Sequence, residues 1–308
     1  MSTTLLLLLG IAGLVLGGEL LVRGAVHLAH RARLPSLLIG LTVVAWGTSA
    51  PELFVSFGAT WRGAADLAVA NVVGSNTFNV LWILGLCAIV APLAVAPALI
   101  RQDVPVMIAA STVTWLLILD GTLSPLEGAG LLVGLLAYTF ALSRREGGEE
   151  APPDAMDSLP VSLALIAGGL VVLVFSGDLL VTAATTLARE AGVSEAVIGL
   201  TIVAAGTSLP ELATSLVATW RGQRDIAVGN VIGSNIANLL LILGVCGTVS
   251  GAGLTVAPPL LAMDVPFMTA VALVCLPVFL SGRVVSRLEG VGLLASGVTY
   301  TAWRVAIG

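Results

Sequence analysis

Two glutamates follow proline inside long apolar runs of this sequence. Glu52 lies in VVAWGTSAPELFVSFGA, at residues 43–59, and is the only ionisable residue between Arg33 and Arg62. Glu211 follows proline in the related run IGLTIVAAGTSLPEL. A carboxylate at the centre of a bilayer costs at least ~2.5 kcal/mol, so it normally faces a partner or an ion pathway. Because no basic residue lies at a matching depth, we expect a bound cation to be the counter-charge.

The two prolines should loosen the helices that carry these glutamates. Pro51 has no N–H for the carbonyl of Gly47, and Pro210 has none for Gly206. Carbonyls freed in this way are costly in hydrocarbon unless they line a polar cavity or meet a ligand. Hydroxyl groups flank both sites, on Thr48, Ser49, Thr207 and Ser208.

Carboxylates, hydroxyls and loosened carbonyls form a donor set made entirely of oxygen. Ca²⁺ takes about 6–8 oxygen ligands in a flexible geometry, whereas Mg²⁺ needs a near-ideal octahedron and keeps its waters. No His or Cys accompanies these groups in the sequence, which argues against a zinc or copper site. The set therefore favours Ca²⁺.

A second pair of motifs adds polar side chains to the same picture. VVGSNTFN occupies residues 72–79 and VIGSNIAN occupies residues 231–238. In each motif the serine and the last asparagine are four residues apart, so they share one helix face. These side chains are Ser75, Asn79, Ser234 and Asn238.

The composition places these motifs in a membrane. Of the 308 residues, 57% are hydrophobic and only 10% are charged, whereas a soluble domain carries roughly 25% charged residues. We expect no nucleic-acid partner, because the net charge is −5 and the sequence has no basic stripe. The three cysteines lie in apolar segments and are expected to serve packing.

Ten apolar segments are long enough to approach the roughly 20 residues that cross a bilayer. They cover residues 3–28, 35–60, 67–91, 103–120, 126–143, 160–186, 194–219, 226–250, 263–281 and 288–306. The long polar interruption SRREGGEEAPPDAMDS is typical of a flexible linker.

The two sides of this linker repeat one another. GELLVRGAVHLA returns as GDLLVTAATTLA, and DLAVANVVGSNTFNVL returns as DIAVGNVIGSNIANLL, each 159 residues later. Because five spans per repeat is an odd number, the second repeat must enter the membrane from the opposite side. We therefore predict an all-α polytopic membrane protein, with ten transmembrane helices arranged as two inverted five-helix repeats. The repeats are 1–143 and 160–308, and a cytoplasmic linker spans 144–159.

The arginines predict an orientation. With both termini outside, ten arginines lie in the inner loops and three on the outer side, which satisfies the positive-inside rule. The inner set is Arg23, Arg31, Arg33, Arg101, Arg144, Arg145, Arg221, Arg224, Arg283 and Arg287. We expect a multi-pass protein of the plasma (inner) membrane.

The paired GTS-x-PEL and GSN-x-x-N blocks resemble the two alpha repeats of the sodium/calcium exchanger family, within the cation/calcium exchanger superfamily. The resemblance covers essentially the whole chain. It implies calcium ligation by Glu52 and Glu211 with backbone oxygens of Thr48 and Thr207. It also implies flanking sodium sites formed by Ala45, Ser49, Ser75, Ala204, Ser208 and Ser234. The resemblance places Asn79 and Asn238 at the central position between them. Some microbial members have an aspartate in place of Asn238, which leaves the counter-ion open here.

The leading hypothesis is an antiporter that exchanges Ca²⁺ for Na⁺ by alternating access at a midplane site lined by oxygen. The alternative is a Ca²⁺/H⁺ exchanger in which the same two glutamates carry protons. A passive cation channel is a third hypothesis. An intramembrane hydrolase using Ser49 or Ser208 would need a nearby base, and the sequence offers no lysine. We expect no enzyme activity, no cofactor and no obligatory protein partner besides the bilayer, with Ca²⁺ and Na⁺ as substrates.

Simpler roles compete with ligation at each position. The glutamates could be structural carboxylates satisfied by neighbouring hydroxyls. Asn79 and Asn238 could serve only interhelical hydrogen bonding, and the serines and threonines could repair the interrupted helices.

Overall fold

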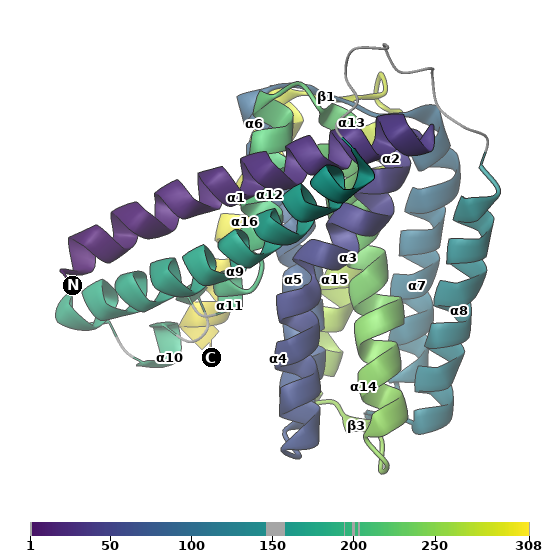
Figure 1. Ribbon diagram of the computed structural model, residues 1–308. Coiled ribbons are helices and arrows are strands. Elements are labelled where there is room, and N and C mark those ends of the chain that lie inside the picture. Colours follow the sequence, from purple (N-terminus) through teal and green to yellow (C-terminus); the bar gives the residue numbers. More distant parts are fainter. Residues whose placement is uncertain (1, 146–157, 194, 199–200, 203, 308) are drawn as a thin grey trace.

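Two long helices lie obliquely across a bundle of shorter ones (Figure 1). The computed structural model describes residues 2–145, 158–193, 195–198, 201–202 and 204–307. The long helices are α1 (Thr3–Ala32) and α9 (Leu159–Glu190), and they pack against each other along their length. Most of the predicted linker lies outside the described residues.

The first half of the chain contains helices interrupted by wider π-helical segments, which are labelled η. After α1 its elements are α2 (Ser36–Ile39), η1 (Gly40–Val44), α3 (Ala45–Thr48), α4 (Ala50–Trp61), α5 (Ala65–Phe78), η2 (Asn79–Leu84), α6 (Gly85–Val90), β1 (Leu93–Ala94), η3 (Leu99–Asp103), α7 (Val104–Leu117), β2 (Thr122–Leu123) and α8 (Pro125–Ser143).

The second half follows a similar order. After α9 its elements are α10 (Glu195–Ile198), α11 (Ala204–Gly206), α12 (Leu209–Trp220), α13 (Arg224–Ala237), η5 (Asn238–Ile242), α14 (Leu243–Val249), β3 (Leu254–Thr255), η6 (Leu260–Asp264), α15 (Val265–Leu280), β4 (Val284–Val285) and α16 (Arg287–Ile307). The described fold is thus helical, apart from four two-residue strands.

Glycine permits the close contact between α1 and α9. A Cβ atom on Gly17 would lie 2.9 Å from the backbone nitrogen of Leu173, and one on Gly169 would lie 2.7 Å from the backbone nitrogen of Leu21. Small residues of this kind are the usual means by which helices approach in a membrane. Arg221, which follows α12, holds α1 through bonds of 2.6 and 2.8 Å to the carboxylate of Glu19.

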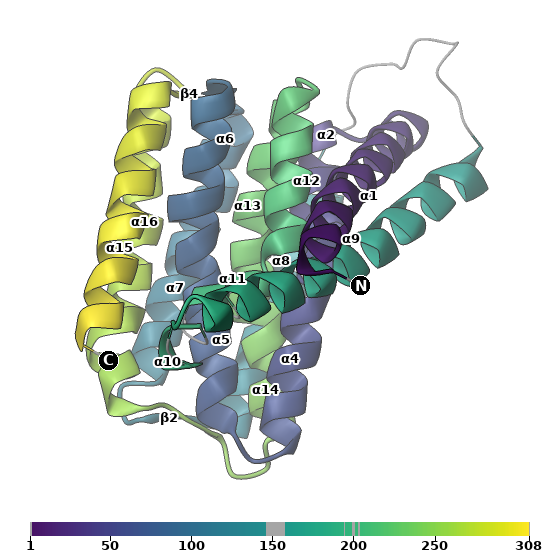
Figure 2. The same cartoon turned by 90° about the vertical axis from the view of Figure 1, so that its left-hand side faces the viewer.

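The strands connect the two halves of the chain at opposite ends of the bundle. β1 pairs antiparallel with β4, and β2 pairs antiparallel with β3. The β1–β4 pair lies at the upper end of Figures 1 and 2, whereas β2 and β3 lie at the lower end. Each pair joins a strand from before the linker to one from after it.

Helix α13 lies at the centre of the bundle, with every residue from Ile226 to Ala237 buried. A Cβ atom on Gly233 would lie 2.5 Å from the carbonyl oxygen of Leu41 and 2.8 Å from the Cβ of Ala45. Glycine is therefore required for α13 to approach η1 and α3 this closely. The approach brings the side chains that follow Gly233 against the first interrupted helix.

Two buried aspartates have partners that the sequence did not suggest. Asp103 accepts hydrogen bonds from Tyr138 at 2.9 Å and from both terminal nitrogens of Arg145, at 2.7 and 3.0 Å. In the second half, Asp264 contacts Tyr300 and pairs with Arg304 at 2.9 Å. These clusters tie the start of α7 to the end of α8, and η6 to α16.

Length and hydropathy support fewer spans than the ten predicted. Six described helical stretches are long and apolar enough to cross a bilayer, or seven if the bent pair Ser36–Thr48 and Ala50–Trp61 forms one span. The six are Thr3–Ala32, Ala65–Val90, Pro125–Ser143, Leu159–Glu190, Arg224–Val249 and Leu260–Leu280. A polytopic helical membrane protein is thus supported, while ten spans in two inverted repeats stay a prediction.

Candidate functional site

Both Pro-Glu motifs lie where a helix is interrupted. The axis bends by 44° between the stretch that ends at Thr48 and α4, and Ser49 at the break has φ −79° and ψ 4°. In the second half, Thr207 and Ser208 separate α11 from α12, and Ser208 has φ −88° and ψ 7°. Each proline occupies the first turn of the following helix, where its missing N–H removes no helical hydrogen bond. Glu52 and Glu211 therefore project from first turns.

The two glutamates are cross-linked to the opposite motif. Ser49 Oγ donates to Glu211 Oε1 at 3.0 Å, and Ser208 Oγ donates to Glu52 Oε1 at 3.0 Å. All four side chains are buried, with both glutamates at 0% exposure. The structure thus brings together residues that are about half the chain apart in sequence.

The remaining oxygens of this cluster are acceptors without donors. Glu52 Oε2, Glu211 Oε2, Asn79 Oδ1 and Asn238 Oδ1 are all buried, and none has a hydrogen-bond partner among the described residues. Buried polar atoms are normally paired, and an orphaned one calls for an explanation such as a bound ion. Four orphaned acceptors contributed by both motifs fit the donor set that Ca²⁺ prefers.

The described part of the candidate site lacks the cluster of three His, Cys, Asp or Glu side chains that is common at metal sites. Among the described residues, no three His, Cys, Asp or Glu side chains gather where they could share a metal ion. Only two carboxylates supply negative charge here, so amide, hydroxyl or backbone oxygens would have to complete the coordination of a bound cation.

A chain of polar contacts leads from Asn238 to Glu52. Asn238 Nδ2 donates to Ser75 Oγ at 3.1 Å, and Ser75 Oγ lies 3.0 Å from Ser208 Oγ. Ser208 uses its one hydroxyl hydrogen on Glu52, so Ser75 must donate to Ser208. Ser75 therefore orients Ser208 toward the carboxylate while accepting from the amide.

The serine of the other GSN motif is arranged differently. Ser234 Oγ donates to the carbonyl oxygen of Ala45 at 3.3 Å, and that carbonyl also accepts from the Ser49 N–H at 3.0 Å. The two serines therefore have different roles. Ser75 contacts the hydroxyl of Ser208, whereas Ser234 contacts a backbone carbonyl, that of Ala45.

The hydroxyl groups of the two threonines have different surroundings, while ligation by the backbone oxygens of Thr48 and Thr207 stays a prediction. Thr48 Oγ1 donates to Asn230 Oδ1 at 3.1 Å and approaches Ala45 O at 3.3 Å, so its hydroxyl is committed to neighbouring residues. Thr207 Oγ1 is a buried atom without a described partner. Ala204 begins α11, and its side chain is outside the description.

The sequence analysis did not single out two asparagines that donate hydrogen bonds to the backbone carbonyls of the glutamates. Asn71 Nδ2 donates to the backbone carbonyl of Glu52 at 3.3 Å and to Ser56 Oγ at 3.0 Å. Asn230 Nδ2 makes the corresponding contacts with the carbonyl of Glu211, at 3.3 Å, and with Ser215, at 2.9 Å. The repeat itself carried the signal, because both asparagines recur in the matching blocks DLAVANVVGSN and DIAVGNVIGSN.

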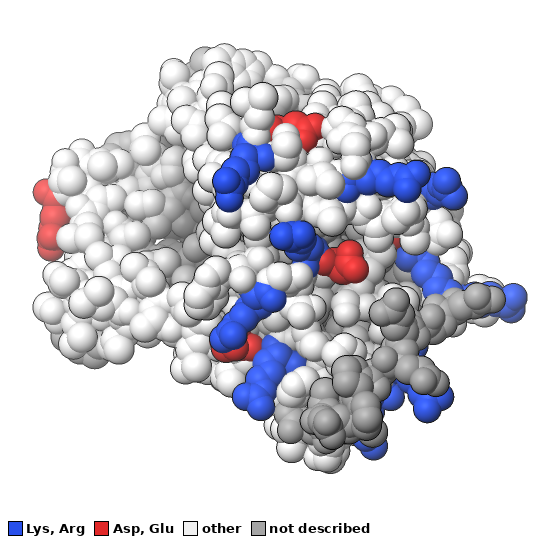
Figure 3. All heavy atoms as spheres, turned by 90° about the horizontal axis from the view of Figure 1, so that it is seen from above, with Lys and Arg blue, Asp and Glu red and all other residues white. Residues whose placement is uncertain are grey.

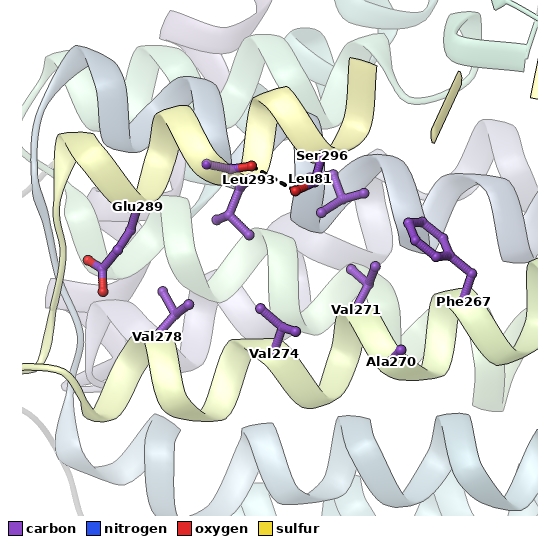
Figure 4. Close-up of a pocket in the computed structure, with 10 residues that line it drawn as sticks. Leu81, Phe267, Ala270, Val271, Val274, Val278, Glu289, Leu293 and Ser296 are labelled. Atoms are coloured by element: carbon purple, nitrogen blue, oxygen red, sulfur yellow. Dashed lines mark hydrogen bonds between the residues drawn. The ribbon is translucent and has the colours of Figure 1, made fainter. Parts of the chain in front are cut away.

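A hollow on the surface lies apart from this cluster. A groove of about 370 Å³ runs between α15 and α16 and is lined mainly by apolar side chains. Figure 4 shows Val271, Val274 and Val278 of α15 facing Leu293 and Ser296 of α16 across it. None of the candidate ligands lines this groove, and its apolar lining suits lipid chains rather than ions.

Comparison with known proteins gives a consistent result. The profile described as "Sodium/calcium exchanger protein" matches residues 2–144 and 161–306. The chain belongs to the sodium/calcium exchanger family. The resemblance drawn from the paired motifs is confirmed, and this member of the family is a multi-pass membrane transporter of the cation/calcium antiporter class.

Individual members of the sodium/calcium exchanger family match over almost the whole chain. The putative antiporter CaxA of Alkalimonas amylolytica is 37% identical, with 96% of this chain and 97% of that protein covered. The sodium/calcium exchanger MaX1 of Methanosarcina acetivorans is 33% identical, with 98% and 97% covered. A solved structure of the sodium-calcium exchanger NCX_Mj has a TM-score of 0.85 at 30% identity and covers 97% of each chain.

Proposed function

We propose that this protein exchanges Ca²⁺ for Na⁺ by alternating access, at a site formed by the two interrupted helices. The observation that carries the proposal is the set of four buried acceptor oxygens without donors, on Glu52, Glu211, Asn79 and Asn238. A divalent cation between them would neutralise both carboxylates and occupy all four acceptors. The names of MaX1 and NCX_Mj as sodium/calcium exchangers support the choice of ions.

The site also has the properties that exchange requires. Ser49 donates to Glu211 and Ser208 donates to Glu52, which gathers both carboxylates in one buried cluster. Two ionised carboxylates in such a cluster repel each other, so we expect the cluster to favour a bound cation. Such a site favours replacement of one cation by another over simple release. Hydroxyl and amide oxygens suit Na⁺ as well as Ca²⁺, because both are hard cations that prefer oxygen ligands.

Two inverted repeats would explain how one site can serve both sides of the membrane. Three features support them: the family profile matches the chain in two separate ranges, the glutamates are cross-linked to the opposite motif, and equivalent strand pairs close both ends of the bundle. We propose 1–143 and 160–308 as the repeats, joined by a linker at 144–159.

The counter-ion is tested with purified protein in liposomes. With sodium inside and none outside, at equal pH on both sides, we expect uptake of radioactive calcium that stops when sodium is omitted. A proton gradient imposed without sodium should drive little uptake. Uptake driven by the proton gradient and indifferent to sodium would instead establish the Ca²⁺/H⁺ alternative, which uses the same two glutamates.

The orientation is proposed from the arginines. Figure 3 looks onto the end of the bundle that carries the β1–β4 pair, and arginine side chains are spread over it. Arg101, Arg283 and Arg287 lie within a few residues of these strands in sequence. Under the positive-inside rule, this end faces the cytoplasm and both termini face outward.

Cysteine labelling checks this orientation. The three native cysteines are buried and should first be replaced by serine or alanine. A cysteine in place of the exposed Gln102, near β1, should resist an impermeant thiol reagent in intact cells. A cysteine in place of the exposed Asp120, near β2, serves as the matched control and should react. The opposite labelling pattern would reverse the orientation.

A further inference from the structure

We propose that Asn76 and Asn235 are positioning residues that fix which way the amides of Asn238 and Asn79 face. The inference rests on the proposed cation site, but the resemblance implied no role for either residue. All four asparagines are buried, at no more than 2% exposure. They form a crossed lattice in which each half of the chain orients a candidate ligand of the other half.

Backbone carbonyls anchor this lattice. Asn76 Nδ2 donates to the backbone oxygen of Asn235 at 3.2 Å, and Asn235 Nδ2 donates to the backbone oxygen of Asn76 at 3.3 Å. A carbonyl oxygen can only accept. The nitrogen end of each side-chain amide must therefore face the backbone, because the reverse orientation would place two oxygens against each other.

The fixed amides then determine the orientation of their neighbours. Because Asn76 Nδ2 is bonded to the backbone oxygen of Asn235, Asn76 Oδ1 faces Asn238. Asn238 Nδ2 donates to this oxygen at 3.0 Å. In the same way Asn235 presents Oδ1 to Asn79, whose Nδ2 donates at 3.0 Å. Asn238 and Asn79 must therefore turn their own Oδ1 atoms away from the lattice.

Those two Oδ1 atoms are the buried acceptors without donors described above. A cation needs the oxygen of an amide and is repelled by its N–H groups, so a reversed amide would oppose binding. Residues behind metal ligands commonly act by fixing the orientation of those ligands, and their loss costs about 10–100-fold in metal affinity. Asn76 and Asn235 have the contacts needed for this role.

The side-chain amides of Asn238 and Asn79 are not held by the same number of hydrogen bonds. Asn238 Nδ2 also donates to Ser75 Oγ at 3.1 Å, which gives it a second anchor. The described residues provide Asn79 Nδ2 with the contact to Asn235 and no counterpart of Ser75. Loss of Asn235 should therefore have the larger effect.

The test measures calcium affinity of the purified full-length protein by titration calorimetry, with folding checked by size-exclusion chromatography. Asn235→Ala should weaken calcium binding by about tenfold or more. An ionised aspartate carries oxygens on both sides and no donor, so its orientation does not matter. In an Asn79→Asp background, Asn235→Ala should therefore cost nothing or improve affinity. In an Asn238→Asp background, the tenfold loss should remain.

This dependence on the background separates positioning from packing. A purely structural role would give Asn235→Ala the same loss in both aspartate backgrounds, and that result would overturn the proposal. If Asn235→Ala does not fold, Asn76→Ala provides the mirrored test, with rescue expected in Asn238→Asp and a smaller effect overall. Wild-type calcium binding by Glu52→Gln would refute the cation site itself. Loss of binding in Glu52→Gln without any background dependence would refute only the positioning role.

Discussion

Replacement of Glu52 or Glu211 by glutamine should reduce calcium exchange by at least about a hundredfold, because the number of charged ligands is a main determinant of calcium affinity. Glutamine keeps the volume of the side chain and can still accept from Ser208 or Ser49 through its oxygen. It replaces the second carboxylate oxygen, the one without a donor, by an N–H₂ group that repels a cation. Transport in proteoliposomes measures the effect.

Glu127→Gln is the matched control for these variants. Glu127 caps the start of α8 by accepting from the backbone N–H of Ser124 at 2.8 Å, and glutamine can fill the same capping position. This variant should keep wild-type exchange. That result would show that a Glu→Gln change outside the candidate site does not impair transport. Wild-type exchange in Glu52→Gln or Glu211→Gln would exclude that residue as an essential ligand.

The largest effect on stability is expected from Arg145. Asp103 has a fully buried side chain, and Arg145 holds both of its oxygens. Removing one partner of a buried ion pair leaves an uncompensated charge and costs about 3–5 kcal/mol. Arg145→Met should therefore lower the unfolding temperature in detergent sharply, measured by intrinsic fluorescence.

Two comparisons make the Arg145 prediction specific. Asp103→Asn in the Arg145→Met background should recover much of the loss, because it removes the buried charge. Arg304→Met should cost less, since the Arg304–Asp264 pair is more exposed, with side-chain exposures of 28% and 12% against 17% and 0%. Equal losses in Arg145→Met and Arg304→Met would show that burial does not determine the contribution of these pairs.

The sequence singled out the two glutamates of the candidate site but did not show which side chains contact each of them. A glutamate behind proline in an apolar run is conspicuous, and the repeat of the motif indicated that Glu52 and Glu211 act together. The pairing of Ser49 with Glu211, and of Ser208 with Glu52, could not be predicted, because spacing within one motif says nothing about which helix lies opposite.

The asparagine lattice was beyond sequence reasoning for a related reason. Asn76 and Asn235 contact each other's backbone across the two halves of the chain, and such contacts depend on how closely α5 and α13 approach. The π-helical segments that begin at Asn79 and Asn238 have no signature in apolar periodicity. Wide turns of this kind are frequent at functional sites, and here they start at two candidate ligands.

Fold class was predictable because composition alone requires a membrane. The number of spans was harder to derive, since it depends on how interrupted helices are counted. One candidate span, Ser36–Trp61, is bent at the residue that donates to Glu211. The interruption that divides this span into two shorter helices is thus the feature that places Ser49 in the candidate site.

Anomalous X-ray diffraction from crystals soaked in calcium or strontium would locate the bound cation. We expect one strong anomalous peak within coordination distance of Glu52 Oε2 and Glu211 Oε2, with Asn79 Oδ1 and Asn238 Oδ1 facing it. The peak should be lost when sodium replaces the divalent ion. A divalent cation bound elsewhere, with no ion near these four oxygens, would show that Glu52 and Glu211 do not form the calcium site.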